Sequence, residues 1–245
     1  MNTPVRLVVF ADDWGRHPSS CQHLIGRLLP RYPTLWVNTI GTRLPKFTME
    51  DLAKVVVKVR QWSGAGAAEA VALPEHLETV NPKMWPGFRA TWQRRINARL
   101  MSRAVNGALG ARDVGEKRVV VSTLPITADL VGRIDADAWI YYCVDDFSVW
   151  PGLDGEVIDR MERDLVAKVD AIVAVSDTLV ARMAEMGGQT RLITHGIDLG
   201  HWRKPAESVE DEACAEWWPA SGPVSLFWGV IDPRLDAEWC LRLAE

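Results

Sequence analysis

Short apolar segments alternate with longer segments of helical periodicity along most of the chain. The apolar segments are Val5–Ala11, Thr34–Asn38, Glu78–Val80, Val119–Ser122, Trp139–Cys143, Ala171–Val175 and Thr190–Thr194. Several are continuous runs of Val, Ile and Leu, which is typical of strands that are covered by helices on both faces. The intervening periodicity predicts helices at Ser20–Leu29, Met49–Trp62, Phe88–Leu109, Thr127–Ile134, Gly155–Lys168 and Asp177–Met186. The alternation predicts an α/β fold, a Rossmann-like parallel sheet with helices on both faces.

The character of the sequence changes after Asp198. Residues 203–222 are rich in Glu, Ala, Pro and Ser and show little apolar periodicity, so they are expected to form a linker. Val224–Val230 then predicts a new strand, and Leu235–Glu245 predicts the start of a helix. A strand and part of a helix cannot bury a core by themselves. We therefore expect a domain at 1–202, a linker at 203–222 and the opening of a truncated second Rossmann-like domain at 223–245.

Composition excludes several classes of protein. The net charge of −4 over 245 residues gives no general attraction to nucleic acid, so no nucleic-acid partner is expected. No apolar stretch approaches the roughly 20 residues that span a bilayer, and the first apolar segment runs into acidic residues instead of a cleavage site. The 4 cysteines lie far apart without a C-x-x-C pair, so no metal site is expected and the thiols are expected to be free. A cytoplasmic location follows as the expectation.

A polar, glycine-bearing loop follows the first predicted strand. Its residues are Asp12, Asp13, Trp14, Gly15, Arg16 and His17, and His23 lies on the helix that comes next. Open α/β sheets bind ligands at the carboxyl ends of their strands. Free amides at a helix start favour an anion, although the loop lacks a G-x-G-x-x-G motif. His23 fits either a ligand contact or a hydrogen bond to a neighbouring loop.

Two adjacent carboxylates, Asp145 and Asp146, follow the fifth predicted strand. They fit hydrogen bonding to, or proton uptake from, an acceptor hydroxyl. They fit equally the capping of a turn or helix. Because side chains alternate along a strand, the two carboxylates are not expected to face the same cleft.

The segment Lys83–Arg103 holds 6 basic residues and no acidic one, with Trp85, Phe88 and Trp92 interleaved. On a helix, Trp92, Ile96 and Leu100 form an apolar face, and Arg95, Arg99 and Arg103 form a basic stripe. One interpretation is an ordinary surface helix with solvated arginines. The other is docking to anionic lipid or to a phosphate-bearing acceptor, with Trp and Phe at the interface.

The order of these motifs resembles the amino-terminal half of GT-B glycosyltransferases, specifically the large retaining family 4-like group. The segment 17–24 is similar to the family's R-P-Q-H-L helix start, and 141–150 is similar to its tyrosine and acidic segment. Residues 171–176 resemble its A-x-V-A-V-S strand, 195–198 its N-G-V-D signature, and 226–232 the opening of its second domain. The first loop has one glycine where many relatives have two.

This resemblance implies an enzyme that transfers a sugar from a nucleotide-sugar donor to a glycan, lipid or small-molecule acceptor, without a metal or other cofactor. It implies acceptor binding by Asp13, Trp14, His17 and His23, and catalysis by Asp145 and Asp146. Gly15, Arg16 and Gly229 would lie on the side of the donor phosphates. A role in polysaccharide biosynthesis at the inner face of the membrane is the corresponding expectation.

Two other functions fit the same sequence. One is a nucleotide-sugar 2-epimerase of the same fold, and the other is a non-catalytic acceptor-binding subunit. In the resembling family, the diphosphate-binding Arg and Lys and two glutamates belong to the second domain. We therefore expect the 245-residue chain alone to show no transfer activity.

Overall fold

The computed structural model describes residues 3–16, 19–39, 73–203, 224–227, 229, 231 and 235–243. These residues belong to two compact units, a first unit at Met1–His195 and a second unit at Gly196–Glu245. The boundary lies inside the His195–Asp198 motif, a few residues before the predicted end of the first domain. The predicted helix at Met49–Trp62 and most of the predicted linker lie outside the described residues.

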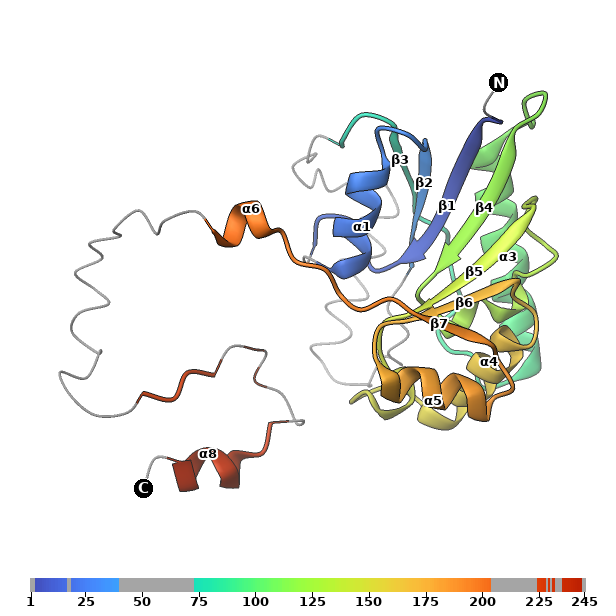
Figure 1. The fold of residues 1–245 in the computed structure, drawn as a ribbon. Coiled ribbons are helices and arrows are strands. Elements are labelled where there is room, and N and C mark those ends of the chain that lie inside the picture. Colours follow the sequence, from blue (N-terminus) through green and yellow to red (C-terminus); the bar gives the residue numbers. More distant parts are fainter. Residues whose placement is uncertain are drawn as a thin grey trace, which may run out of the picture. The chain divides into compact units, whose positions relative to one another are not determined.

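The first unit contains one sheet of seven parallel strands in the order β3-β2-β1-β4-β5-β6-β7 (Figure 1). Its strands are β1 (Val5–Ala11), β2 (Thr34–Asn38), β3 (Leu77–Val80), β4 (Lys117–Ser122), β5 (Ala138–Cys143), β6 (Ala171–Ala174) and β7 (Thr190–Leu192). In register, Val9 pairs with Trp36 of β2 and with Val121 of β4. The predicted α/β class with a parallel Rossmann-like sheet is confirmed.

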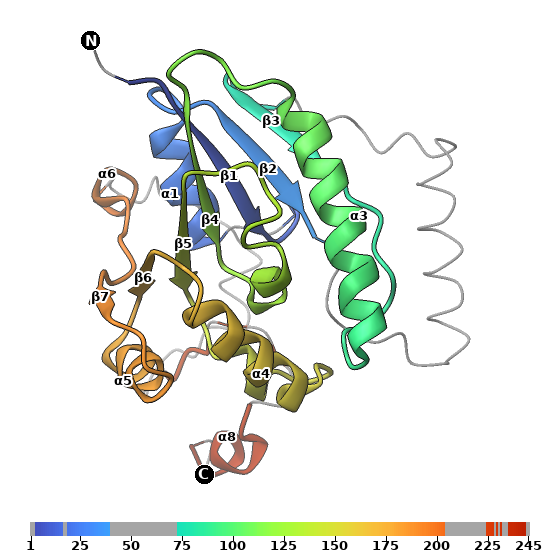
Figure 2. The same ribbon diagram turned by 90° about the vertical axis from the view of Figure 1, so that its right-hand side faces the viewer.

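Helices cover both faces of this sheet, as Figure 2 shows. The helix α1 (Ser20–Leu28) covers one face, and α3 (Thr91–Leu109) runs along the other. The other helices of the first unit are the 3₁₀ helices η1 (Pro125–Asp129) and η2 (Phe147–Val149), α4 (Gly155–Val166) and α5 (Asp177–Glu185). Ser19 and Ser176 cap α1 and α5 with their side chains, as their positions in the sequence predict.

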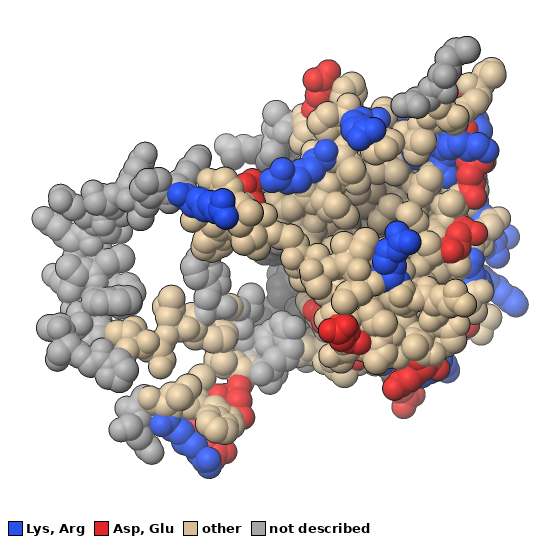
Figure 3. All heavy atoms as spheres, in the orientation of Figure 1, with Lys and Arg blue, Asp and Glu red and all other residues tan. Residues whose placement is uncertain are grey.

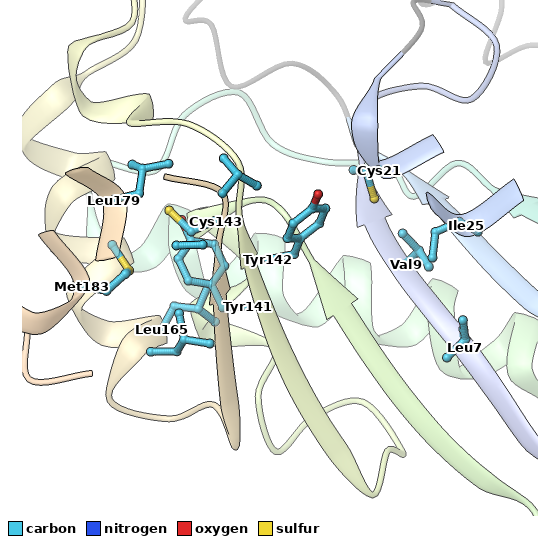
Figure 4. Packing of buried hydrophobic residues seen from close by; sticks show 14 of the residues in the cluster. Leu7, Val9, Cys21, Ile25, Tyr141, Tyr142, Cys143, Leu165, Leu179 and Met183 are labelled. Carbon is cyan, nitrogen blue, oxygen red and sulfur yellow. The ribbon is translucent and has the colours of Figure 1, made fainter. Parts of the chain in front are cut away.

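Alternate residues of each central strand enter two hydrophobic cores. Leu7, Val9 and Ala11 face the buried Cys21 and Ile25 of α1 (Figure 4). On the other face, Val8 and Phe10 pack with the α3 residues Ala98, Met101, Val105 and Leu109. Burial on both faces explains why β1 has no polar position between Leu7 and Ala11.

Several predicted elements differ from the structure in type or in their bounds. Residues 127–134 form a 3₁₀ helix and turns instead of an α-helix, because Pro125 opens the segment and Thr127 bonds the carbonyl of Leu124 through its amide and hydroxyl. The helix α3 begins at Thr91 and not at Phe88, because Gly87 adopts a positive φ of 97°. β7 ends two residues earlier than predicted.

The second unit contains the helices α6 (Leu199–Trp202) and α8 (Ala237–Leu243). Its described residues 224–227 form no strand, so the strand predicted at Val224–Val230 is not found in them. A strand requires a neighbouring strand to bond its backbone groups, and none pairs with these residues in the described part of the chain.

Candidate functional site

The strand order places a topological switch between β1 and β4. From β1 the chain continues to β2 on one side, and from β4 it continues to β5 on the other side. In open parallel sheets, ligands bind outside the carboxyl ends of the strands at such a point. The candidate site is therefore the carboxyl edge of the sheet around β1, where the predicted Asp12–Arg16 loop begins.

The loop after β1 is tied to β2 through tryptophan and asparagine side chains. The indole Nε1 of Trp36 donates to the carbonyl of Asp12 at 3.0 Å. The ring of Trp14 meets the ring of Trp36 edge-on, with 4.8 Å between centroids. The backbone amide of Trp14 donates to Asn38 Oδ1 at 3.0 Å. These contacts hold the half-buried Trp14 in one position at the edge of the sheet.

The same loop is also tied to α1. Gly15 adopts a φ of 77°, which favours glycine, and its amide donates to Gln22 Oε1 at 3.2 Å. Gln22 Nε2 donates in turn to the carbonyl of Asp13 at 3.4 Å. The expectation that the loop amides are free for an anion is therefore wrong for Gly15. Arg16 Nη1 lies 3.5 Å from Asp13 Oδ2; the side chain of Arg16 is exposed to solvent and that of Asp13 is partly exposed.

The structure describes only one of the two predicted histidines. His23 is exposed on α1, and its amide donates to the carbonyl of the capping Ser19. No hydrogen bond of its imidazole to another loop is found within the described residues, so its binding role stays a prediction. His17 lies outside the described residues.

Two asparagines at this edge are absent from the sequence-based site. Asn38 ends β2, and its Nδ2 donates to Oδ1 of Asn81, the residue that follows β3, at 2.8 Å. The polar edge therefore extends over β1, β2 and β3. An amide side chain directly at the end of a buried strand is the signal that would have identified both residues.

The predicted acidic pair lies at the carboxyl end of β5. Asp146 Oδ1 accepts the amide of Ser148 at 2.9 Å, and Asp146 caps η2. Its Oδ2 lies 3.4 Å from Arg182 Nη1 of α5. Asp145 is half-buried, and its Oδ1 accepts the amide of Asp146 at 2.8 Å. These bonds favour the capping interpretation for Asp146, whereas the catalytic roles of both residues stay predictions.

A buried polar cluster stabilises the segment that follows β5. Glu162 is fully buried, and Tyr141 Oη donates to its Oε1 at 2.5 Å. Arg182 Nη2 donates to Glu162 Oε2 at 2.8 Å and to Asp159 Oδ1 at 2.9 Å. Burial raises the pKa of the Glu162 carboxyl, and the bonds from Tyr141 and Arg182 oppose that rise. The cluster joins β5, α4 and α5 and fixes the segment that carries Asp146.

Tyr142 links β5 to the start of α1. Its phenol is buried beside Cys21, as Figure 4 shows, and interacts with the side chain of Ser20. Burial raises the pKa of the Cys21 and Cys143 thiols to about 12. Both thiols therefore stay protonated at neutral pH, which excludes them as thiolate nucleophiles.

The predicted residues of α3 lie apart from this edge. Trp92, Arg95, Arg99 and Arg103 are exposed on α3, on the face of the sheet opposite to α1 (Figure 2). Gly229 is an exposed residue of the second unit. No group of three or more His, Cys, Asp or Glu side chains suited to a metal ion occurs among the described residues. No helix in the described part is long and apolar enough to cross a membrane.

The fold and the edge define a class: an α/β protein with a doubly wound parallel sheet and a polar site at its topological switch. No family model and no curated protein matches the sequence. Among solved structures, the chain is similar to a UDP-glucosyltransferase from Polygonum tinctorium, described as capable of glucosylating indoxyl, in a complex with 3,4-dichloroaniline. The identity is 10%, the TM-score is 0.42, and the match covers 89% of this chain and 58% of that enzyme. The chain thus spans less than two thirds of that protein's length.

Proposed function

We propose that this chain is the acceptor-side part of a nucleotide-sugar glycosyltransferase. The order of its sequence motifs resembles the retaining family 4-like enzymes, as described above. The observation that carries the proposal is the loop after β1, where the ring of Trp14 is held against Trp36 and the partly exposed Asp13 precedes it in the chain. An aromatic ring packs on the apolar face of a sugar, and a carboxylate accepts hydrogen bonds from sugar hydroxyls.

In this proposal the carboxyl edge binds the acceptor. Asp13 and Trp14 contact it from β1, and Asn38 adds an amide from β2. His17 and His23 complete the acceptor side, and Asp145 accepts a hydrogen bond from the hydroxyl that attacks. The catalytic assignment of Asp146 is weaker than that of Asp145, because Asp146 is engaged in the cap and with Arg182.

The reaction replaces one glycosidic bond by another. The acceptor hydroxyl forms a bond to the anomeric carbon on the same face from which the nucleoside diphosphate leaves, so the configuration is retained. The developing charge on the diphosphate is the main demand of the transition state. Arg16 and the backbone at Gly15 contact the donor phosphates in this proposal, and the donor-side role of Gly229 stays a prediction. The other donor contacts belong to a second domain in the resembling family.

Tryptophan indole signals allow the acceptor site to be tested directly. We expect saccharide acceptors, screened one at a time by ¹H–¹⁵N NMR, to shift the indole resonances of Trp14 and Trp36. The resonances of Trp85 and Trp92, on the other face, serve as internal controls and stay in place. Trp→Phe variants assign the four signals. Shifts confined to Trp85 and Trp92, or no saccharide that shifts Trp14, would contradict the proposal.

A carboxylate variant sharpens the same test. We expect Asp13→Asn to weaken acceptor binding about tenfold, the loss of one hydrogen bond to a charged group. Asp113→Asn, an exposed position beyond α3, is the matched control and leaves binding unchanged. Incubation with UDP-sugars and no acceptor is a further arm. Accumulation of the 2-epimer in that arm would establish the epimerase function instead.

A further inference from the structure

The outward face of α3 carries apolar and basic side chains side by side. Its apolar members are Trp92, Ile96 and Leu100, which are 50%, 39% and 39% exposed. Its basic members are Arg95, Arg99 and Arg103, which are also exposed. The opposite side of the helix is buried in the core. We call these six residues, together with Trp85, the α3 surface.

Trp85 joins the α3 surface from the loop before the helix. Its ring meets the ring of Trp92 edge-on at 5.4 Å, and it is 47% exposed. Among the described tryptophans of the first unit, these two are the exposed ones. The sequence-based expectation placed Phe88 at this interface as well, but Phe88 is buried in the core, because the chain turns at Gly87 before the helix begins.

Asn97 fixes the position of Trp85. Asn97 is buried on α3, and its Oδ1 accepts the amide of Trp85 at 2.6 Å. Its Nδ2 donates to the carbonyls of Trp85 and Gly87, each at 3.1 Å. Met84 and Phe88 are buried on either side of this turn. The exposure of Trp85 is therefore imposed by the fold, since its neighbours are anchored and its own ring is held outward.

The arginines of this region fall into two groups. Arg94 binds Asp129 and Asp164 with its side chain, and Arg89 binds Asp154, so both join α3 to neighbouring elements. Within the described residues, no ion pair is found for the second group, the three arginines of the α3 surface. No acidic residue occurs between 83 and 103. Among the described residues, the positive charge of the α3 surface therefore has no acidic partner.

The α3 surface differs from the face of the molecule that Figure 3 shows, on which basic and acidic side chains are interspersed. The α3 surface combines exposed tryptophan and branched aliphatic side chains with arginines that have no ion pair among the described residues, and this combination suits a specific kind of partner. Tryptophan resides at the level of lipid headgroups, aliphatic groups enter the acyl boundary, and arginine binds anionic headgroups.

We propose that the α3 surface docks this chain on an anionic lipid bilayer. The helix lies parallel to the membrane plane, Trp85 and Trp92 insert at the headgroup level, and Arg95, Arg99 and Arg103 contact lipid phosphates. Docking by α3 leaves the carboxyl edge of β1 outside the interface, because α1 and α3 lie on opposite faces of the sheet (Figure 2). Membrane docking is independent of the glycosyltransferase proposal, so each can fail without the other.

Vesicle sedimentation tests the docking. We expect the full chain to sediment with phosphatidylcholine vesicles that contain phosphatidylglycerol and to remain in the supernatant with phosphatidylcholine alone. Salt weakens the binding because it screens the arginines. Arg99→Gln with Arg103→Gln weakens partitioning about 25-fold, from about fivefold for each cation. Trp85→Ser with Trp92→Ser weakens it about tenfold or more.

Matched variants serve as controls. Arg31→Gln with Arg191→Gln removes two exposed charges of the first unit away from α3, and Trp239→Ser removes an exposed indole of the second unit. Both bind as the unsubstituted chain does, and thermal melting confirms that all variants are folded. Equal binding to neutral vesicles, equal loss in the control variants, or full competition by soluble glycerol phosphate would overturn the proposal.

Discussion

The two edges of the parallel sheet both carry Asp and Arg side chains, but they differ in how these side chains are bonded. At the amino-terminal edge, Arg118 is buried and bonds Glu116, Asp135 and the carbonyls of Gly110 and Ala111. At the carboxyl edge, the exposed Arg16 and the partly exposed Asp13 lie 3.5 Å apart. The charges around Arg118 are engaged by several groups of the protein, whereas Asp13 and Arg16 after β1 remain open to solvent.

This difference indicates which polar groups are available to a ligand. Asp137 ties β4 to β5 at the amino-terminal edge, where it accepts from the amide of Arg118 at 2.8 Å and from Arg112 at 2.5 Å. The loop after β1 is held instead by its backbone, through Asn38 and Gln22, so its carboxylate is left outward. The charged groups of the first edge therefore contribute to stability, whereas the loop of the second edge leaves a carboxylate partly open to a ligand.

Removal of Arg118 gives the largest expected effect. Arg118→Leu leaves two carbonyls and the carboxylate of Glu116 without their buried partner, so we expect a loss of about 3 kcal/mol in the free energy of unfolding. Urea denaturation measures it. Lys117→Ala removes a more exposed cation of the same edge and should cost less than about 1 kcal/mol. Equal costs for the two variants would contradict the contrast between buried and exposed charge.

Gly155 tests the packing at the β5 end of the carboxyl edge. A Cβ at Gly155 would lie 2.2 Å from the carbonyl oxygen of Ser148, so Gly155→Ala forces η2 away from α4. We expect a destabilisation of about 1–3 kcal/mol in urea denaturation. Gly107→Ala is the control, because its Cβ meets no atom on the exposed side of α3, and it should stabilise by about 0.5–1 kcal/mol.

The loop after β1 should respond in function more than in stability. Asn38→Ala removes the partner of the Trp14 amide and should cost about 1 kcal/mol in the free energy of unfolding. Asp13→Asn should change stability by less than about 0.5 kcal/mol, because its carboxylate is exposed. Thermal and urea unfolding measure both. A large loss of stability in Asp13→Asn would show that this carboxylate is structural and would remove the contrast between the edges.

The last prediction concerns how the stability of the fold depends on pH under acid conditions. The amide of Arg118 and the side chains of Lys117 and Arg112 lower the pKa of Asp137 from 3.8 to about 2. Since the folded pKa lies below the unfolded one, the stabilising contribution of Asp137 is complete above about pH 4 and is lost as pH falls toward 2. Urea midpoints between pH 5 and pH 2 should decline less steeply in Asp137→Asn. An unchanged slope would contradict this assignment.

Sequence reasoning was most accurate where burial alone decides the structure. The bounds of Val5–Ala11 and Thr34–Asn38 were predicted as observed, because a strand covered on both faces has a continuous apolar run. Ser19 and Ser176 cap their helices, which is a common use of a hydroxyl directly before a helix. The start of the polar loop after β1 was also predicted, because polar residues follow directly on the apolar run.

Contacts between residues that are far apart in the chain could not be predicted from the sequence. The count of basic residues at Lys83–Arg103 did not show that Arg94 reaches Asp164, 70 residues further along the chain. The capping of η2 by Asp146 depends on a turn that periodicity does not show. The role of Asn97 was missed because its partners are carbonyls of a preceding loop. Every residue has a backbone carbonyl, so the sequence does not indicate which carbonyl accepts a hydrogen bond.

The bond between Gln22 and the amide of Gly15 has a consequence for affinity. A ligand oxygen that uses this amide must first displace Gln22 Oε1, which lies 3.2 Å from it. The chain thus contains an intramolecular competitor, and the apparent dissociation constant equals the intrinsic one divided by the fraction of molecules in which the amide is open. Weak binding at this edge would then report an occupied amide and not a poor fit. Titration of a Gln22→Ala chain separates these two causes.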